Sequence, residues 1–194
     1  MILQAAGYLS GLAILLSFVP YIRDIFKGTT RPERASWLIW TILGAISFAS
    51  QFAEGATWSL IMTGAQAVGD GFIFVLAIKY GLGGFQRRDI AGLLAAGLGL
   101  ALWGLTGNAA VALFIIIFID GTGAVLTVLK TYEHPETETA SAWVLTFLGG
   151  FFASAAVGRW DLVLLAFPVY VCLASISILL AMRFGRKHKF AHAP

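Results

Sequence analysis

The chain has 194 residues, of which 59% are hydrophobic and 12% charged, and its net charge is +3. A water-soluble domain carries about 25% charged residues, and the mean hydropathy of +0.85 is far above that of a soluble protein. The apolar runs reach the roughly 20 residues that a membrane-spanning helix needs. They do not alternate in polarity as the strands of a membrane barrel do. The composition therefore predicts an integral membrane protein of the all-α class.

In chain order, hydropathy predicts a series of spans joined by short connections. Short connections make neighbouring spans antiparallel, so the expected structure is a tight helical bundle. The expected spans are seven, at residues 3–26, 35–54, 57–80, 90–106, 109–132, 139–158 and 160–182.

Basic residues gather on one side of these spans. Of 13 lysines and arginines, all but Arg159 fall in the tail or in the connections after the first, third and fifth spans. Cytoplasmic connections of membrane proteins carry the excess of Lys and Arg. We therefore expect a multi-pass protein of the plasma membrane with its N-terminus outside and its C-terminus in the cytoplasm.

A duplication organises the chain. The stretch Pro20–Trp40 returns at Gly123–Leu145, each copy joining two apolar runs by a charged turn with a lysine and a proline. Lys27 and Lys130 are 103 residues apart, as are the prolines of the two turns. Because one extra span lies between the two triplets, both point the same way, which makes a parallel repeat of a kind that occurs in transporters.

The duplication divides the chain into four parts. The first three-helix repeat covers residues 1–84 and the second covers 108–185, while a linker helix at 85–107 joins them and a basic cytoplasmic tail follows at 186–194.

Two aspartates fall near the middle of predicted spans. A charged group at that depth costs about 2.5–3.5 kcal/mol on insertion scales, so Asp70 and Asp120 are the first candidates for solute binding. Further polar or aromatic residues recur at helical spacing, either on the helix faces that carry the two aspartates or on one face of the second predicted span. We expect these three faces to line a central cavity. The further residues are Gln66, Thr127, Trp40, Ser47 and Gln51. The alternative is that these groups only bond to one another across helices.

Prolines and tryptophans mark other special positions. Pro20 and Pro168 each remove a backbone hydrogen bond inside a predicted helix, so we expect hinges there. The tryptophans near span ends are expected to anchor at the membrane interface, with Trp40 also a candidate for solute contact. These interface candidates are Trp37, Trp40, Trp58, Trp143 and Trp160.

The composition of reactive residues argues against an enzyme. The single cysteine, Cys172, lies inside an apolar run, so a disulfide framework and a thiolate metal cluster are not expected. The histidines fall in polar segments, and no nucleophile–base pair appears. We expect no metal, no cofactor and no nucleic acid as partner. The histidines are His134, His188 and His192.

The repeated stretch resembles the loop that names the PQ-loop family, and the three-plus-one-plus-three plan is similar to that of the SWEET sugar carriers. The residues that carry the resemblance are PYIRDIFKGTTRPERASWLIW. Tyr21 stands where the family has glutamine, and Gly123-Ala124 where the second copy would have its Pro-Gln pair. The resemblance implies a mid-depth site on the third and seventh helices, where this chain has Asp70 and Cys172. An aspartate there favours a cationic solute or proton coupling over a sugar.

We therefore predict a secondary transporter that moves a small polar or cationic solute by alternating access, with the solute, the lipid bilayer and, in a coupled cycle, protons as partners. A ligand-binding receptor or sensor of the same fold is the main alternative. A seven-helix retinal protein needs a lysine in the middle of its last span, and residues 160–182 contain none. The oligomeric state stays open, with a homo-oligomer as one outcome.

Overall fold

The computed structural model describes residues 2–53, 58–84, 86–106, 109–158, 160 and 162–191. This part of the chain is almost entirely helical, which confirms the all-α prediction. Its helices are α1 (Ile2–Phe26), α2 (Arg34–Ala53), α3 (Trp58–Tyr80), α4 (Arg87–Thr106), α5 (Ala109–Glu133), the short 3-10 helix η1 (Pro135–Thr137), α6 (Ala140–Ala156) and α7 (Leu162–Ala191).

The helix bounds follow the predicted spans closely, with one clear difference at the end of the chain. The apolar run ends near residue 182, but α7 continues to Ala191 through a basic segment. Arginine and lysine are good helix formers, so the helix does not stop where the hydrophobic residues do. The end of the last span was therefore placed too early.

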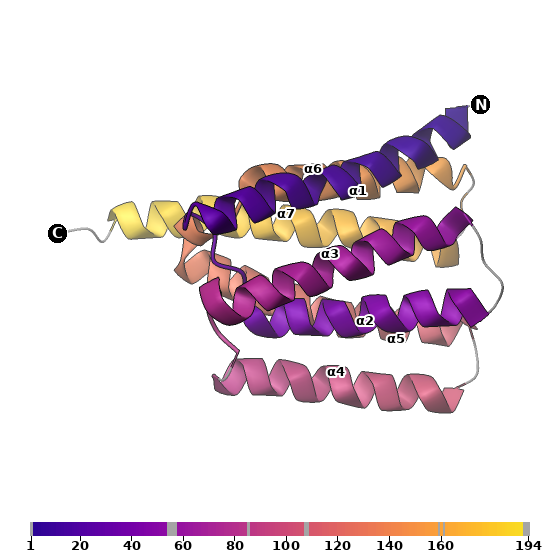
Figure 1. Cartoon of the computed structure of the whole chain (residues 1–194), viewed down its shortest axis with the longest axis horizontal. Coiled ribbons are helices and arrows are strands. Elements are labelled where there is room, and N and C mark those ends of the chain that lie inside the picture. Colours follow the sequence, from indigo (N-terminus) through magenta and orange to yellow (C-terminus); the bar gives the residue numbers. More distant parts are fainter. Residues whose placement is uncertain are drawn as a thin grey trace.

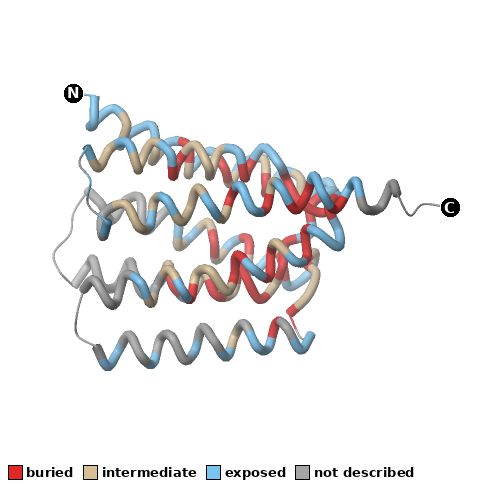
Figure 2. Tube along the Cα trace, turned by 180° about the vertical axis from the view of Figure 1, so that it is seen from behind, coloured by how far each residue is buried: buried red, intermediate tan, exposed pale blue. Residues whose placement is uncertain are grey.

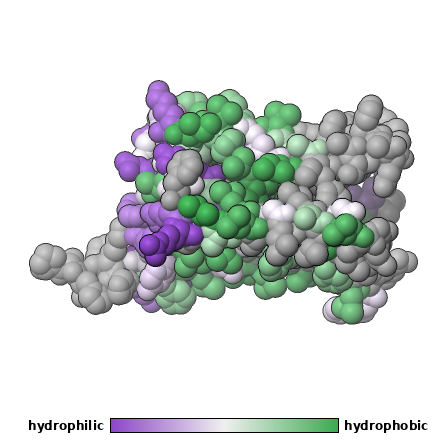
Figure 3. Space-filling view, turned by 90° about the horizontal axis from the view of Figure 1, so that it is seen from below, coloured by the Kyte–Doolittle hydropathy of each residue, from purple (hydrophilic) through white to green (hydrophobic). Residues whose placement is uncertain are grey.

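Two helices of the described chain are long and apolar enough to cross a membrane, namely Ile2–Phe26 and Leu165–Lys187. The flanks of the bundle carry many exposed large apolar side chains, such as Val19 on α1, Val68 on α3 and Leu173 on α7. Figure 3 shows apolar residues along the body of the molecule and hydrophilic ones gathered at one end. This distribution fits a helical protein whose sides face lipid.

Six of the helices form a closed ring. α1 packs on α6, α6 on α7, α7 on α5, α5 on α2, α2 on α3, and α3 returns to α1. α4 lies outside this ring against α5 and α2 (Figure 1). Successive α-helices run in opposite directions, so α1, α3, α5 and α7 point the same way.

Burial is concentrated at the end of the bundle where α1, α3, α5 and α7 finish, which we call the basic end (Figure 2). The main apolar cluster lies in this half and includes Tyr21, Trp37 and Trp143. Near the opposite end the described residues are mostly exposed or half-buried. The ring is therefore closed by packed side chains at its basic end.

Candidate functional site

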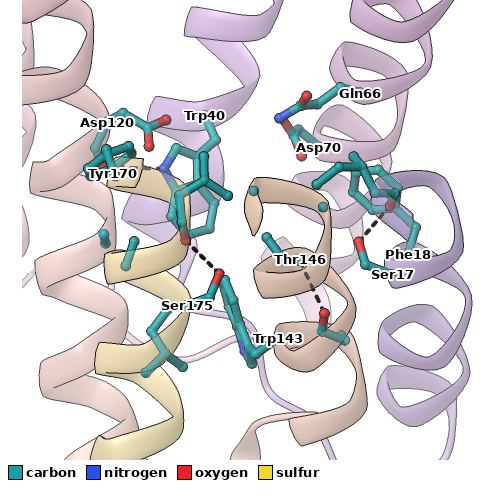
Figure 4. Close-up of a pocket in the computed structure, with 18 of the residues that line it drawn as sticks. Ser17, Phe18, Trp40, Gln66, Asp70, Asp120, Trp143, Thr146, Tyr170 and Ser175 are labelled. Atoms are coloured by element: carbon teal, nitrogen blue, oxygen red, sulfur yellow. Dashed lines mark hydrogen bonds between the residues drawn. The ribbon is translucent and has the colours of Figure 1, made fainter. Parts of the chain in front are cut away.

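A cavity of about 370 Å³ lies inside the ring, lined by side chains from all six ring helices (Figure 4). This volume is within the range of small-molecule sites, which is roughly 300–1,000 Å³. Towards the opposite end its walls include Gln66 and Phe167, which are exposed. The inner part of the cavity is therefore covered by the basic end, while exposed side chains lie in its outer walls.

Asp70 of α3 and Asp120 of α5 both face this cavity from different triplets of helices. Asp70 is 7% exposed, and Gln66 lies beside it one helical turn away (Figure 4). The residues that line the cavity include no lysine or arginine. Two carboxyl groups without a protein cation at their depth give the cavity a strong preference for positive charge.

Tyr170 of α7 is a lining residue that the sequence analysis did not single out. Its ring lies beside Asp120 (Figure 4), and its buried hydroxyl has no hydrogen-bond partner within the described residues. A buried polar group usually has a partner, and the neighbouring carboxyl group of Asp120 is placed to interact with this hydroxyl. A polar tip on an aromatic ring inside an apolar run leaves no mark in hydropathy, which is why the sequence did not reveal it.

Aromatic rings form the floor of the cavity at the basic end. The ring centroids of Tyr21 and Trp37 are 5.1 Å apart, those of Trp37 and Trp40 are 5.0 Å apart, and those of Trp40 and Trp143 are 6.2 Å apart. Aromatic faces attract cations within about 6 Å of the ring centroid. The floor and the two carboxyl groups are therefore suited to the same kind of ligand.

The placement of the tryptophans corrects part of the sequence-based prediction. Trp37 and Trp143 are buried in the core cluster rather than anchored at the membrane interface. Trp160, in contrast, is 97% exposed. A position near a span end could not separate these cases, because it does not say whether the side chain faces the interior of the bundle or its surroundings.

Trp40 is the ring of the floor that bonds to α5 beside Asp120. Its Nε1 donates to the backbone oxygen of Asp120 at 3.3 Å, and a Cβ added to Gly123 would lie 2.9 Å from that nitrogen. The glycine therefore lets the indole of α2 approach the backbone of α5. This contact joins the two triplets beside the cavity.

Below the floor, a polar network that we call the latch seals the basic end. It connects the segment 21–31 with the segment 130–139 through Tyr21, Thr30, Arg31, Lys130, Glu138 and Thr139. The centre of the latch is an ion pair between Lys130 and Glu138, both buried.

The ion pair of the latch is bonded from several sides. Tyr21 Oη donates to Glu138 Oε1 at 3.1 Å, and Trp143 Nε1 donates to Glu138 Oε2 at 2.8 Å. Lys130 Nζ donates to the backbone oxygen of Arg31 at 2.7 Å. A buried ion pair is stable when further hydrogen bonds satisfy both groups, and here those bonds reach across the two triplets.

The structure places two predicted site residues away from the cavity. Thr127 is fully buried and donates to Ser36 Oγ at 2.9 Å. Cys172 Sγ lies 3.7 Å from the backbone oxygen of Phe147, against α6. Both were expected to contact solute, and both instead join helices, because each lies on the side of its helix that faces a neighbour and not the ring axis.

The remaining candidates have mixed outcomes. Gln66 lines the cavity as predicted, while the side chains of Ser47 and Gln51 fall outside the described residues. Pro168 lines the cavity within α7, and Pro20 lies inside α1, which runs unbroken past it. Hinge motion at either proline stays a prediction.

Neither the protein-family models, nor the curated proteins, nor the solved structures compared with this chain contain a match to it, so what it does must be argued from its own residues.

Proposed function

We propose that the protein is a secondary transporter for a compact organic cation. The observation that carries this proposal is the cavity in which Asp70 and Asp120 lie above an aromatic floor, with no lysine or arginine among the lining residues. The carboxyl groups bind the positive charge, the aromatic faces contact its apolar part, and the hydroxyl of Tyr170 beside Asp120 adds a polar group to the same wall.

The helix contacts support two like-facing repeats. Exchanging α1 with α5, α2 with α6 and α3 with α7 turns each ring contact into another ring contact. The pair α1–α6 becomes α5–α2, the pair α2–α3 becomes α6–α7, and the pair α1–α3 becomes α5–α7. Such a two-fold relation about an axis along the bundle is the arrangement that parallel repeats of transporters produce.

The two triplets supply a mechanism of alternating access. With the basic end in the cytoplasm, the cavity is sealed towards the cell by the latch and open towards the outside. A bound cation attracts both carboxyl groups and offsets part of their repulsion, which allows α3 and α5 to approach each other. Closure of the outer end and separation of the latch then expose the same cavity to the cytoplasm.

Removing either cavity carboxyl group tests the proposal. In proteoliposomes, Asp70→Asn and Asp120→Asn are each expected to lower choline uptake at least about tenfold. This loss corresponds to about 1.4 kcal/mol, at the low end of a hydrogen bond to a charged group. Ser177→Ala is the control, because this exposed serine bonds only within α7. The neutral isostere 3,3-dimethylbutanol must not compete with choline. Wild-type uptake in both asparagine variants, or equal competition by the neutral compound, would remove the proposed function.

Access to the cavity distinguishes a transporter from a receptor of the same fold. In a Cys172→Ala background, an impermeant thiol reagent outside the cell should modify Ala153→Cys near the open end. Choline should then make Ala142→Cys, next to the floor, reactive from the cytoplasmic side, since both alanines line the cavity. A receptor would show modification from one side only, with or without choline.

A further inference from the structure

Glu33 is a second buried acid at the basic end, and it lacks the partner that its repeat counterpart has. It is 1% exposed and lies just before α2. Its counterpart Glu138, 105 residues later, is paired with Lys130. The lysine of the first repeat, Lys27, is exposed, and Glu33 forms no ion pair within the described residues. An ionised carboxylate in such a position would be costly.

Charged groups surround Glu33 without neutralising it. The guanidinium of Arg34 donates to the backbone oxygens of Ala77 and Gly83, each at 2.9 Å. On the α4 side, Asp89 Oδ2 accepts from the backbone nitrogens of Gly84 and Gln86. From α1 and α5 the nearest titratable groups are Tyr21 and Lys130, which bond to Glu138.

The second carboxylate lies close to Glu33. A Cβ added to Gly83 would lie 2.1 Å from Glu33 Oε1 and 3.4 Å from Asp89 Oδ2. The two carboxyl groups therefore meet at this glycine. Glu33 Oε1 itself has no hydrogen-bond partner in the part of the chain that the structure describes.

The side chain of Ser36 contacts more acceptors than its hydroxyl has hydrogens, and its backbone nitrogen also donates to Glu33 Oε2 at 2.6 Å. Ser36 Oγ lies 2.8 Å from Glu33 Oε2, 2.6 Å from the backbone oxygen of Gly123 and 2.9 Å from Thr127 Oγ1. A serine hydroxyl has one hydrogen and two lone pairs. The contact to the carbonyl of Gly123 is the shorter of the two, so we assign the serine hydrogen to it, and Thr127 donates to Ser36. With this assignment, the contact between Ser36 Oγ and Glu33 Oε2 is a hydrogen bond if Glu33 is a carboxylic acid that donates its proton to Ser36 Oγ.

We propose that Glu33 is the proton-binding site of the closed basic end, where its acid form holds α2 to α5 through Ser36. The inference rests on the proposed transport function, since α2 and α5 belong to the two triplets that must separate. When the proton leaves Oε2 for water, the Ser36 hydrogen turns to the carboxylate and its bond to Gly123 is lost. Loss of the proton therefore weakens the closed state, which links opening of the basic end to proton release.

The direction of the pH effect follows from the surroundings of Glu33. Burial raises the pKa of its carboxyl group and is the largest effect, the bonds from Ser36 lower the pKa, and the charge of Asp89 raises it by less, so that the net shift is upward. A carboxyl group released into water has an ordinary pKa of about 4.3. Between that value and the raised one, the closed state binds more protons than the open state. Raising the pH through this window must therefore favour opening.

A reporter cysteine beside the floor measures this opening without any solute. The reporter cysteines are introduced into full-length Cys172→Ala protein in inside-out vesicles. The rate at which a thiol reagent modifies Ala142→Cys is divided by the rate for Thr29→Cys, an exposed position, so that the effect of pH on thiol ionisation cancels. We expect this ratio to rise at least about tenfold from pH 5.5 to pH 8, and to stay low and constant in Glu33→Gln. Glu138→Gln, the matched control, should raise the ratio at every pH while keeping its pH dependence.

Two results would overturn the assignment. One is a ratio in otherwise unchanged protein that does not vary with pH, and the other is a Glu33→Gln protein that keeps the full pH dependence. If Glu33→Gln does not fold, Ser36→Ala replaces it. We then expect a high ratio of modification rates already at pH 5.5, and a pH profile like that of the unchanged protein would contradict the assignment. Because no solute is used, a ratio that does not vary with pH, together with intact choline uptake, would refute the proton site alone. A ratio that varies with pH as expected, together with uptake that does not depend on Asp70 or Asp120, would refute only the cation site.

Discussion

Lys130→Met is expected to destabilise the protein by about 3–5 kcal/mol, the cost of leaving one member of a buried ion pair without its partner. Lys130 is 1% exposed, and its amine is bonded to Glu138 and to the backbone oxygen of Arg31. Methionine fills most of the space that the lysine stem occupies, so the loss is electrostatic and does not come from a cavity. The free energy of unfolding in detergent, from denaturant titration, measures it.

The double variant Lys130→Met/Glu138→Gln provides the internal control. Glutamine keeps an acceptor for Trp143 Nε1 and removes the uncompensated charge, so about half or more of the lost stability should return. Lys27→Met, at the exposed lysine of the other repeat, should change stability by less than about 0.5 kcal/mol. If Lys130→Met were as mild as Lys27→Met, the ion pair would not hold the basic end together.

Gly185→Ala is expected to destabilise the bundle by about 2–3 kcal/mol, the range for overfilling a packed contact. A Cβ at this position would lie 2.4 Å from the backbone oxygen of Tyr132 and 3.1 Å from its carbonyl carbon. Backbone atoms cannot swing aside as a flexible side chain can, so α7 must move away from the end of α5. The shift of the thermal midpoint in detergent measures the effect.

Gly97→Ala on α4 separates this clash from helix propensity. Nothing lies within 4 Å of a Cβ added there, and alanine is a better helix former than glycine by about 1 kcal/mol. Gly97→Ala should therefore leave stability unchanged or raise it. Equal responses of the two variants would show that α7 and α5 are not in close contact at this point.

Local hydropathy explains how much of the fold could be predicted from the sequence. Long apolar runs with short connections define helices almost completely, because a span must satisfy its backbone internally. This is why the predicted bounds agree with α1 to α6 and fail only where α7 leaves the apolar segment. The two aspartates were identifiable for a related reason, since a charge inside an apolar run is costly wherever it points.

Contacts between distant segments could not be deduced in the same way. Glu33 and Glu138 occupy equivalent positions of the two similar sequence stretches, yet among the described residues only Glu138 is paired with a lysine. Lys27 and Lys130 are equivalent in sequence as well, but one is exposed and the other buried. The second turn has two more residues than the first. The effect of this difference on the direction of each lysine and glutamate side chain depends on how the helices pack.

The sequence by itself therefore determined the all-helical class, the bounds of α1 to α6 and the two acids inside apolar runs, because hydropathy and charge act locally along the chain. Only the tertiary structure decided that Trp37 and Trp143 form a floor, that Tyr170 stands beside Asp120, and that Thr127 and Cys172 join helices instead of lining the cavity. These outcomes depend on the rotation of each helix about its own axis. That rotation is set by close packing between segments about a hundred residues apart, which no local pattern records.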